Sequence, residues 1–294
     1  ALCVACLLAL PASADDLTAK KKAVAENLVA WDTRGAARAL EQLVDHADDI
    51  EVIFLRSRHA FLRSRYAEAV ELLEEALKLD PDARDLHTMM GLYKRTRDLM
   101  VDYKEIPTSG GHFIIAVHPG VDEVLVPYAD QALEAAYERL GELFRFRPQE
   151  PVRVEIYPHV QNLADVSPLK SSEIRASGTI ALCKYNRLMI VSPRALVYGY
   201  EWLDTLAHEY IHLLVTRRSR NNVPIWLHEG MAKFYENRWR TDDSAKLART
   251  SEDLLATAVR EKKLIRFEAM SPSMAKLPTQ EDTALAFAEV FMVM

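Results

Sequence analysis

Three histidines and two glutamates lie in one short stretch of the chain, HEYIHLLVTRRSRNNVPIWLHEG, which starts at His208. Residues four apart on a helix lie one turn above each other on the same face. His208 and His212 can therefore point both imidazoles at one ion. Glu209 lies about 100° around the helix, where a carboxylate can take a proton without binding the ion itself. The spacing predicts a metal site with a general base beside it.

A third protein ligand must come from a second helix. Asn221 or Asn222 followed by Pro224 predicts a new helix, with an asparagine as N-cap and the proline in the first turn. A hairpin of two helices can return Glu229 to the two histidines, and three protein ligands plus a water form the set that a catalytic zinc needs. The adjacent His228 is chemically as good a ligand, and the spacing alone leaves this choice open.

The sequences HEYIH and VPIWLHEGMA resemble the gluzincin zinc metallopeptidases, specifically the bacterial peptidase-MA-like family with its HExxH and WLxEG motifs. The resemblance implies one zinc ion per chain, bound by His208, His212 and Glu229. It also implies hydrolysis of a peptide or protein substrate by zinc-activated water, with Glu209 as general base. The alternative hypothesis is a non-catalytic interaction module of the cell envelope, in which the zinc site is structural or vestigial.

Further positions are expected around this site. Zinc-binding histidines need an acceptor for their other ring nitrogen, and Asp204, one turn before His208, is the candidate. The resemblance implies that an extended substrate lies against an edge strand. The strand that ends at 190–192 is predicted either to have this role or to be an ordinary strand of the sheet. No motif identifies the group that stabilises the oxyanion. Tyr235 is near in sequence, but it belongs to the helix that carries Glu229.

The second part of the chain, residues 106–294, is predicted to be an α+β, zincin-like domain with a small mixed sheet and an active-site helix, incomplete at its C-terminus. Its expected elements before that helix are a strand at Phe113–Val117, an amphipathic helix at about 123–144, a half-buried strand over 152–156, and two strands within 178–193 joined near Tyr185 and Asn186. The helical pattern resumes at about Val197 and continues through the histidines.

Residues 15–105 show an almost continuous helix pattern, and Ile50 to Ala83 resembles a 34-residue tetratricopeptide repeat. Its large, small and helix-ending positions are Ile53, Ser57, Ala60, Ala69, Leu73, Ala76 and Pro81. Such repeats stack into a concave binding surface, so a protein partner is expected on the helical repeats. The alternative is a generic helical bundle.

Residues 1–14 are typical of part of a secretory signal peptide, with an apolar run followed by an Ala12-Ser13-Ala14 cleavage site. The run is too short to span a bilayer. We therefore expect an exported protein, periplasmic or extracellular in a bacterial envelope, without stable membrane insertion after cleavage. Cys183 would then be the remaining cysteine, which excludes an internal disulfide. The net charge of −6 gives no support for nucleic-acid binding.

Overall fold

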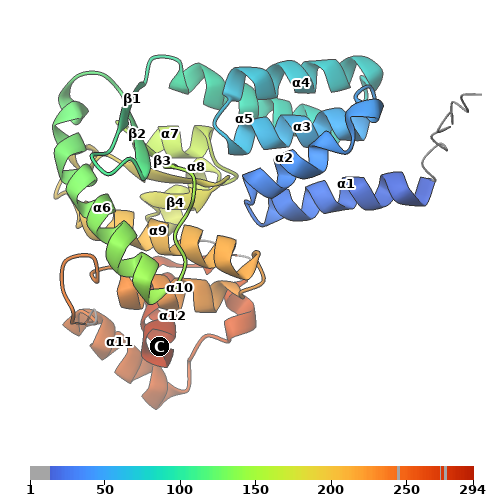
Figure 1. Cartoon of the computed structure of the whole chain (residues 1–294). Helices are drawn as coiled ribbons and strands as arrows, with labels where there is room; N and C mark the ends of the chain where they lie inside the picture. The colour runs from blue at the N-terminus through green and yellow to red at the C-terminus, as the bar shows by residue number, and fades with distance from the viewer. Residues whose placement is uncertain (1–13, 244–245, 272, 275–276) are drawn as a thin grey trace, which may run out of the picture.

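The computed structural model describes residues 14–243, 246–271, 273–274 and 277–294. Within these ranges the chain is α+β, with mostly helices around one mixed sheet of five strands (Figure 1). Residues 1–13 of the predicted signal peptide lie outside the described residues. None of the helices in the described ranges has the length and apolar character needed to cross a membrane.

The N-terminal region consists of five helices, which lie to one side of the sheet (Figure 1). They are α1 (Ala14–Val29), α2 (Thr33–Glu41), α3 (Ile50–Leu62), α4 (Tyr66–Leu79) and α5 (Arg84–Met100). Helices α3 and α4 approach closely because the residues between them are small. Ser57 and Ala69 are fully buried there, and the Ser57 hydroxyl donates to the Ala69 carbonyl at 2.7 Å. The predicted helices are present, whereas their assignment to the tetratricopeptide class stays a prediction.

The sheet has the strand order β1-β2-β3-β5-β4. Its strands are β1 (Lys104–Pro107), β2 (Phe113–Val117), β3 (Val152–Tyr157), β4 (Ala181–Lys184) and β5 (Arg187–Val191). The three central strands are parallel, and β1 and β4 are antiparallel to their neighbours. Tyr185 and Asn186 join β4 to β5 with φ values of 54° and 65°, as a tight hairpin turn requires. The hairpin prediction is confirmed, whereas β1 was not predicted.

Helices cover both faces of the sheet. The remaining ones are α6 (Val126–Leu143), α7 (Val160–Asp165), α8 (Ser171–Ser177), α9 (Trp202–Ser219), α10 (Ile225–Tyr235), α11 (Arg249–Glu261) and α12 (Gln280–Val293). Helices α6 and α9 pack on one face, around Ile115, Val154 and Ile190. The N-terminal helices, α7 and α8 pack on the other, around Tyr157 and Met189.

The start of α9 differs from its prediction. A helix was expected from about Val197, but α9 begins at Trp202. A short 3₁₀ turn at Pro193–Ala195 comes first, and Gly199 has a φ of +63°. A left-handed residue cannot continue a right-handed helix, so the apolar pattern before Trp202 belongs to a loop.

The alternation of β3 predicted a half-buried strand. That prediction was wrong, because the polar face of the strand is also covered. Glu155 is fully buried beneath the N-terminal helices. Its carboxylate lies 2.7 Å from Arg153 Nε and 3.0 Å from Arg187 Nε, and accepts the Tyr66 hydroxyl at 2.5 Å. Burial opposes ionisation of Glu155, but the two guanidinium groups outweigh it and lower its pKa. This stabilising charge is present at neutral pH and is lost as the pH falls below the ordinary glutamate range.

Replacing Glu155 by Gln would keep the shape of the side chain and leave Arg187 buried without its counter-charge. We expect the free energy of unfolding, measured by urea denaturation, to fall by about 3–5 kcal/mol. Glu105→Gln removes the more exposed carboxylate that pairs with Arg153, and should cost less than about 1 kcal/mol. Equal losses in the two variants would contradict a structural role for the buried pair.

Candidate metal centre

Helices α9 and α10 form the predicted hairpin, but its connection differs in detail. Arg220 and Asn221 adopt left-handed φ values of 55° and 62°, which end α9 and reverse the chain. Pro224 occupies the N-cap position of α10 without a side-chain cap. The Asn222 amide donates to the Ser219 carbonyl at 3.3 Å. The predicted asparagine N-cap and first-turn proline were therefore wrong, because the asparagines serve to end α9.

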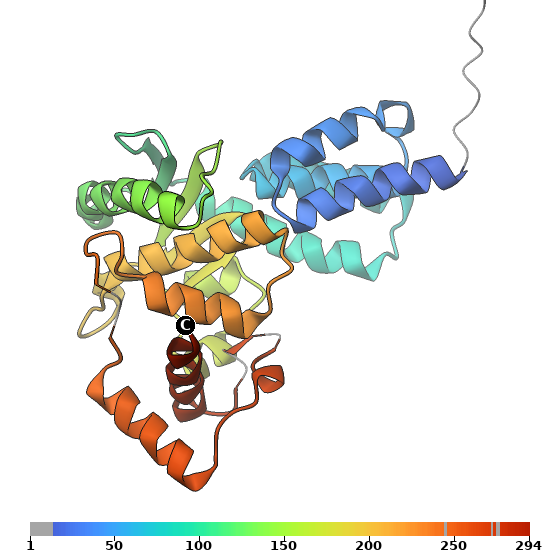
Figure 2. The same ribbon diagram turned by 60° about the horizontal axis from the view of Figure 1, so that its bottom comes forward.

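The WLHEG segment holds α10 in place as well as supplying a carboxylate. Helix α10 lies between α9 and α12 (Figures 1 and 2). A Cβ atom at Gly230 would lie 2.9 Å from the Val290 carbonyl oxygen of α12, so glycine permits this close approach. Trp226 stacks on Phe267, with ring centroids 4.5 Å apart. These contacts fix the side of α10 that faces away from α9.

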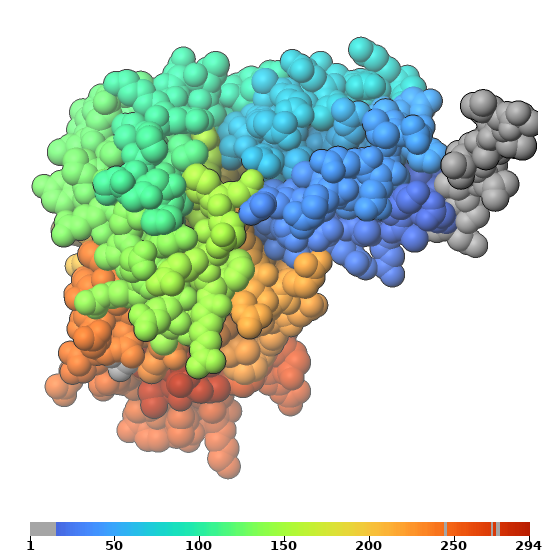
Figure 3. All heavy atoms as spheres, in the orientation of Figure 1, coloured from blue at the N-terminus to red at the C-terminus, as the bar shows by residue number. Residues whose placement is uncertain are grey.

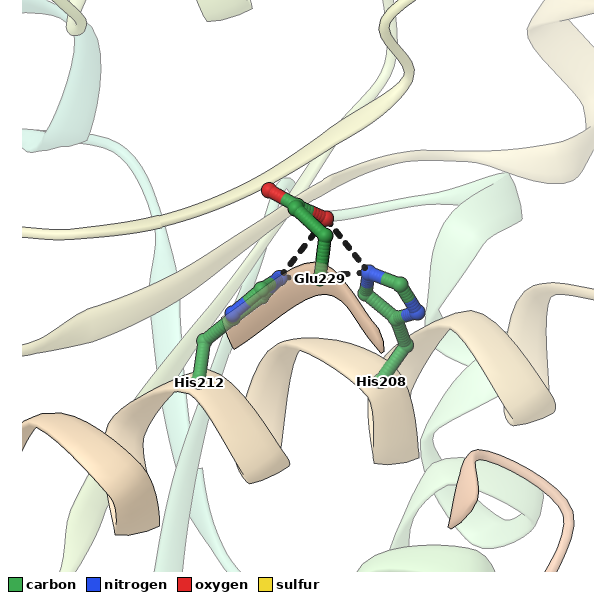
Figure 4. Close-up of side chains that lie close together, drawn as sticks. All are labelled: His208, His212 and Glu229. Atoms are coloured by element: carbon green, nitrogen blue, oxygen red, sulfur yellow. Dashed lines mark hydrogen bonds and ion pairs between the residues drawn. The ribbon is translucent and has the colours of Figure 1, made fainter. Parts of the chain in front are cut away.

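Three of the predicted residues come together at the hairpin: His208, His212 and Glu229 (Figure 4). The two imidazole Nε2 atoms are 3.2 Å apart. Glu229 Oε2 lies 3.6 Å from Nε2 of His208 and 3.4 Å from Nε2 of His212. Ligand atoms at zinc-binding distance, about 2.0–2.1 Å from a tetrahedral ion, are roughly 3.3 Å from one another. The donor atoms are therefore spaced as one tetrahedral ion requires.

The charges of this cluster also suit a cation. Burial opposes ionisation of Glu229, whose side chain is 16% exposed, but the two imidazoles keep its pKa well below the usual range. Burial likewise opposes protonation of His208, yet hydrogen bonds to Glu229 and Glu236 raise its pKa to about 10. Positive charge is thus favoured where the donor atoms meet. A metal ion would displace the proton, because an imidazole binds metal in its neutral form.

His228, the competing third ligand, lies on the other side of His212. Its Nδ1 is 3.5 Å from Nδ1 of His212, whose Nε2 faces Glu229. Burial, together with His212, lowers the pKa of His228 to about 4. A neutral imidazole there can accept a hydrogen bond from the Nδ1–H of His212 and so orient its ring. The structure thus groups Glu229, rather than His228, with the two histidines.

The second ring nitrogen of His208 contacts Glu236, which sequence analysis missed. His208 Nδ1 is 3.0 Å from Glu236 Oε2, and Lys233 Nζ is 2.5 Å from the other carboxylate oxygen. Glu236 follows Glu229 by seven residues, which is two helical turns on one face. That spacing was the signal that could have identified it.

Asp204, predicted for this role, has different partners. Its carboxylate accepts from Trp239 Nε1 at 2.8 Å and from Arg240 Nη2 at 2.6 Å. The prediction was wrong because Asp204 faces the segment after α10 rather than the histidines. It ties that segment to the first turn of α9 and so helps to close the hairpin.

Glu209 lies between α9 and the sheet and is 6% exposed. Burial raises its pKa, although its carboxylate accepts the backbone N–H of Cys183. Cys183 belongs to β4, whose other edge pairs with no strand in the described part of the chain. The strand ending at 190–192, predicted as the substrate strand, is β5, which lies inside the sheet between β3 and β4. That prediction was wrong, and the strand beside Glu209 with a free edge is β4.

Two tyrosines lie near the site in sequence. Tyr235 packs against Phe144, with ring centroids 5.8 Å apart. Tyr200, which no motif singled out, precedes α9 and donates its hydroxyl to the Val191 carbonyl. Burial raises the pKa of Tyr200, and the charge of Glu209 adds to the effect. Tyr200 therefore fixes the loop before α9 in the neighbourhood of Glu209.

Comparison with known proteins identifies one family. Residues 129–294, more than half of the chain, match the family model of the Peptidase MA superfamily. The matched range includes the whole α9–α10 hairpin with Glu209. No curated protein and no solved structure gives a significant match.

Metal binding can test whether Glu236, rather than Asp204, is the carboxylate that orients His208. We expect Glu236→Gln to weaken zinc affinity at least about tenfold, because it removes the charge that orients and polarises His208. Asp204→Asn keeps the side-chain oxygen that accepts from Trp239 Nε1 and lies outside the cluster, so it should leave the affinity within about threefold of the wild type. Competition with a chromophoric chelator measures both values. Weaker binding in Asp204→Asn than in Glu236→Gln would reverse the assignment.

Proposed function

The chain belongs to the Peptidase MA superfamily, and we propose that it is a zinc-dependent peptidase. In this proposal His208, His212 and Glu229 bind one zinc ion and Glu209 is the general base. The observation that carries the proposal is the spacing of the three donor atoms of His208, His212 and Glu229. A separate carboxylate, that of Glu209, follows His208 directly on α9. A purely structural zinc site would not require Glu209.

Bound zinc would polarise the scissile carbonyl and activate water at neutral pH. Glu209 would accept a proton from the attacking water and deliver it to the leaving amine, so that the carboxylate is regenerated. Burial raises the pKa of Glu209, which brings the carboxylate closer to a group that can both take and return a proton. Glu236 would hold the ring of His208 in one orientation through these steps.

Strand β4 is the proposed support for the substrate backbone. Its inner side pairs with β5, with Ala181 opposite Ile190 and Lys184 opposite Arg187. Cys183 turns its N–H to the other side, toward Glu209. An extended peptide that adds to this free edge would pass directly beside the proposed base.

The N-terminal helices and the cellular location belong to the same proposal. We infer that α1–α5 bind a protein partner, because the α3–α4 hairpin has the small buried residues of a tetratricopeptide-like pair. We also propose export to the periplasm or the extracellular space of a bacterial envelope. That location is supported by the sequence of residues 1–14 alone.

Glu209→Gln separates catalysis from metal binding. We expect it to lower the rate of peptide hydrolysis about 10²–10⁴-fold, since the amide cannot accept the proton, while zinc stays at one ion per chain. A fluorogenic peptide library measures hydrolysis and atomic absorption measures zinc. Glu201→Gln, at an exposed position just before α9, is the matched control and should retain both properties.

Two results would decide against the proposed chemistry. Full activity of Glu209→Gln on a peptide that the wild type cleaves would show that Glu209 is not the base. Wild-type protein that binds zinc but cleaves nothing in the library would favour the non-catalytic interaction module.

A further inference from the structure

A cavity of about 330 Å³ lies where the N-terminal helices meet the end of the active-site helix. Three segments line it: residues 30–38 around the start of α2, residues 146–150 after α6, and the C-terminal end of α9. The same parts of the chain meet in Figure 3, where the blue helices approach the orange end of α9. Its volume is in the range of small-molecule sites. Neither Glu209 nor the three clustered residues line it.

The lining carries an excess of positive charge. Its charged residues are the arginines Arg34, Arg38, Arg217 and Arg220 and the carboxylates Asp32 and Glu150. Both carboxylates already have partners, because Asp32 accepts the Gly35 N–H at 2.8 Å and Glu150 accepts the Thr33 hydroxyl at 2.7 Å. This excess stands out in a chain whose net charge is −6.

Arg217 gives the most specific indication. It is half-buried, and its Nε and Nη2 donate to the amide oxygen of Asn186 at 3.1 and 2.6 Å. Burial lowers the pKa of Arg217 by more than the nearby charges of Glu150 and Asp32 raise it. Among the described residues, no carboxylate forms an ion pair with Arg217, Arg34 or Arg38 within 4 Å. Arg34 and Arg38 are exposed, whereas Arg217 is a half-buried cation without a directly paired anion. Burying such a charge is costly, and an anion in the cavity would reduce that cost.

Apart from Thr33 and Gln149, the remaining lining is apolar or aromatic. Trp31 and Phe146 supply ring surface, and Pro148 lies beside them in the lining. Trp31 has a φ of 54°, which is uncommon for a bulky residue. The cavity thus combines arginines with an apolar wall, a combination that suits a ligand with both characters.

We propose that this cavity binds an organic anion, a molecule in which a carboxylate or phosphate group is attached to an apolar body. The anionic group contacts Arg34, Arg38 and Arg217, and the apolar body lies against Trp31 and Phe146. Such a ligand bridges the N-terminal helices and α9. This proposal does not depend on the chemistry proposed for Glu209.

Calorimetric titration of the whole protein at low salt with phenyl phosphate, benzoate, benzamide and inorganic phosphate tests the proposal. We expect both aromatic anions to bind, the neutral benzamide to show no binding, and inorganic phosphate to bind more weakly than phenyl phosphate. Arg34→Ala/Arg38→Ala should weaken binding of phenyl phosphate at least about tenfold, since charged hydrogen bonds are lost. Arg56→Ala/Arg218→Ala removes the same charge at positions that are exposed, as Arg34 and Arg38 are, but lie outside the cavity, and it should change the affinity less than twofold.

Three outcomes overturn the proposal. The first is equal affinity for benzamide and benzoate, and the second is equal weakening by the two arginine double variants. The third is loss of binding in His208→Ala/His212→Ala but not in Arg34→Ala/Arg38→Ala, which would place the anion at the metal centre. If the Arg34→Ala/Arg38→Ala protein unfolds, Arg38→Ala alone provides the same comparison with Arg218→Ala.

Discussion

The carboxylate of Glu229 faces two imidazoles across a largely buried hairpin, and the surrounding structure is arranged to keep it there. Its charge is stable in this place because His208 and His212 supply positive charge or a bound cation does so. The donor atoms meet only if α10 keeps its position along its own axis and its rotation about that axis relative to α9. Gly230 sets the close contact with α12 on one side, and Asp204 ties the chain beyond α10 back to α9 on the other.

A second buried charge connects this hairpin to the N-terminal helices. Arg187 pairs with Glu155 inside the molecule, and its guanidinium lies over the rings of Phe61 and Tyr66 at 5.0 and 5.1 Å. The adjacent Asn186 donates to the Leu62 carbonyl of α3 and accepts from α9. The β4–β5 turn is therefore held between the N-terminal helices and α9. The position of β4, and with it the N–H that Glu209 accepts, depends on both.

Sequence patterns predicted the local features well and the long-range ones poorly. The two histidines four residues apart and the turn at Asn186 follow from geometry within a few residues, so both could be predicted. Glu229 needed the resemblance as well, because the distance across a hairpin cannot be read from spacing. Asp204 was misassigned, since its partners come from beyond α10. Strand β3 was misjudged because polar residues normally face water, whereas here Glu155 pairs with Arg153 and Arg187 and is covered by the N-terminal helices.

X-ray absorption at the zinc edge tests the ligand set at the hairpin most directly. The protein loaded with one equivalent of zinc should show two imidazole nitrogens and one carboxylate oxygen at about 2.0–2.2 Å, and no sulfur. A third imidazole would indicate that His228 replaces Glu229. A sulfur at about 2.3 Å would indicate Cys183. Either spectrum, or failure to bind zinc, would contradict the site described for His208, His212 and Glu229.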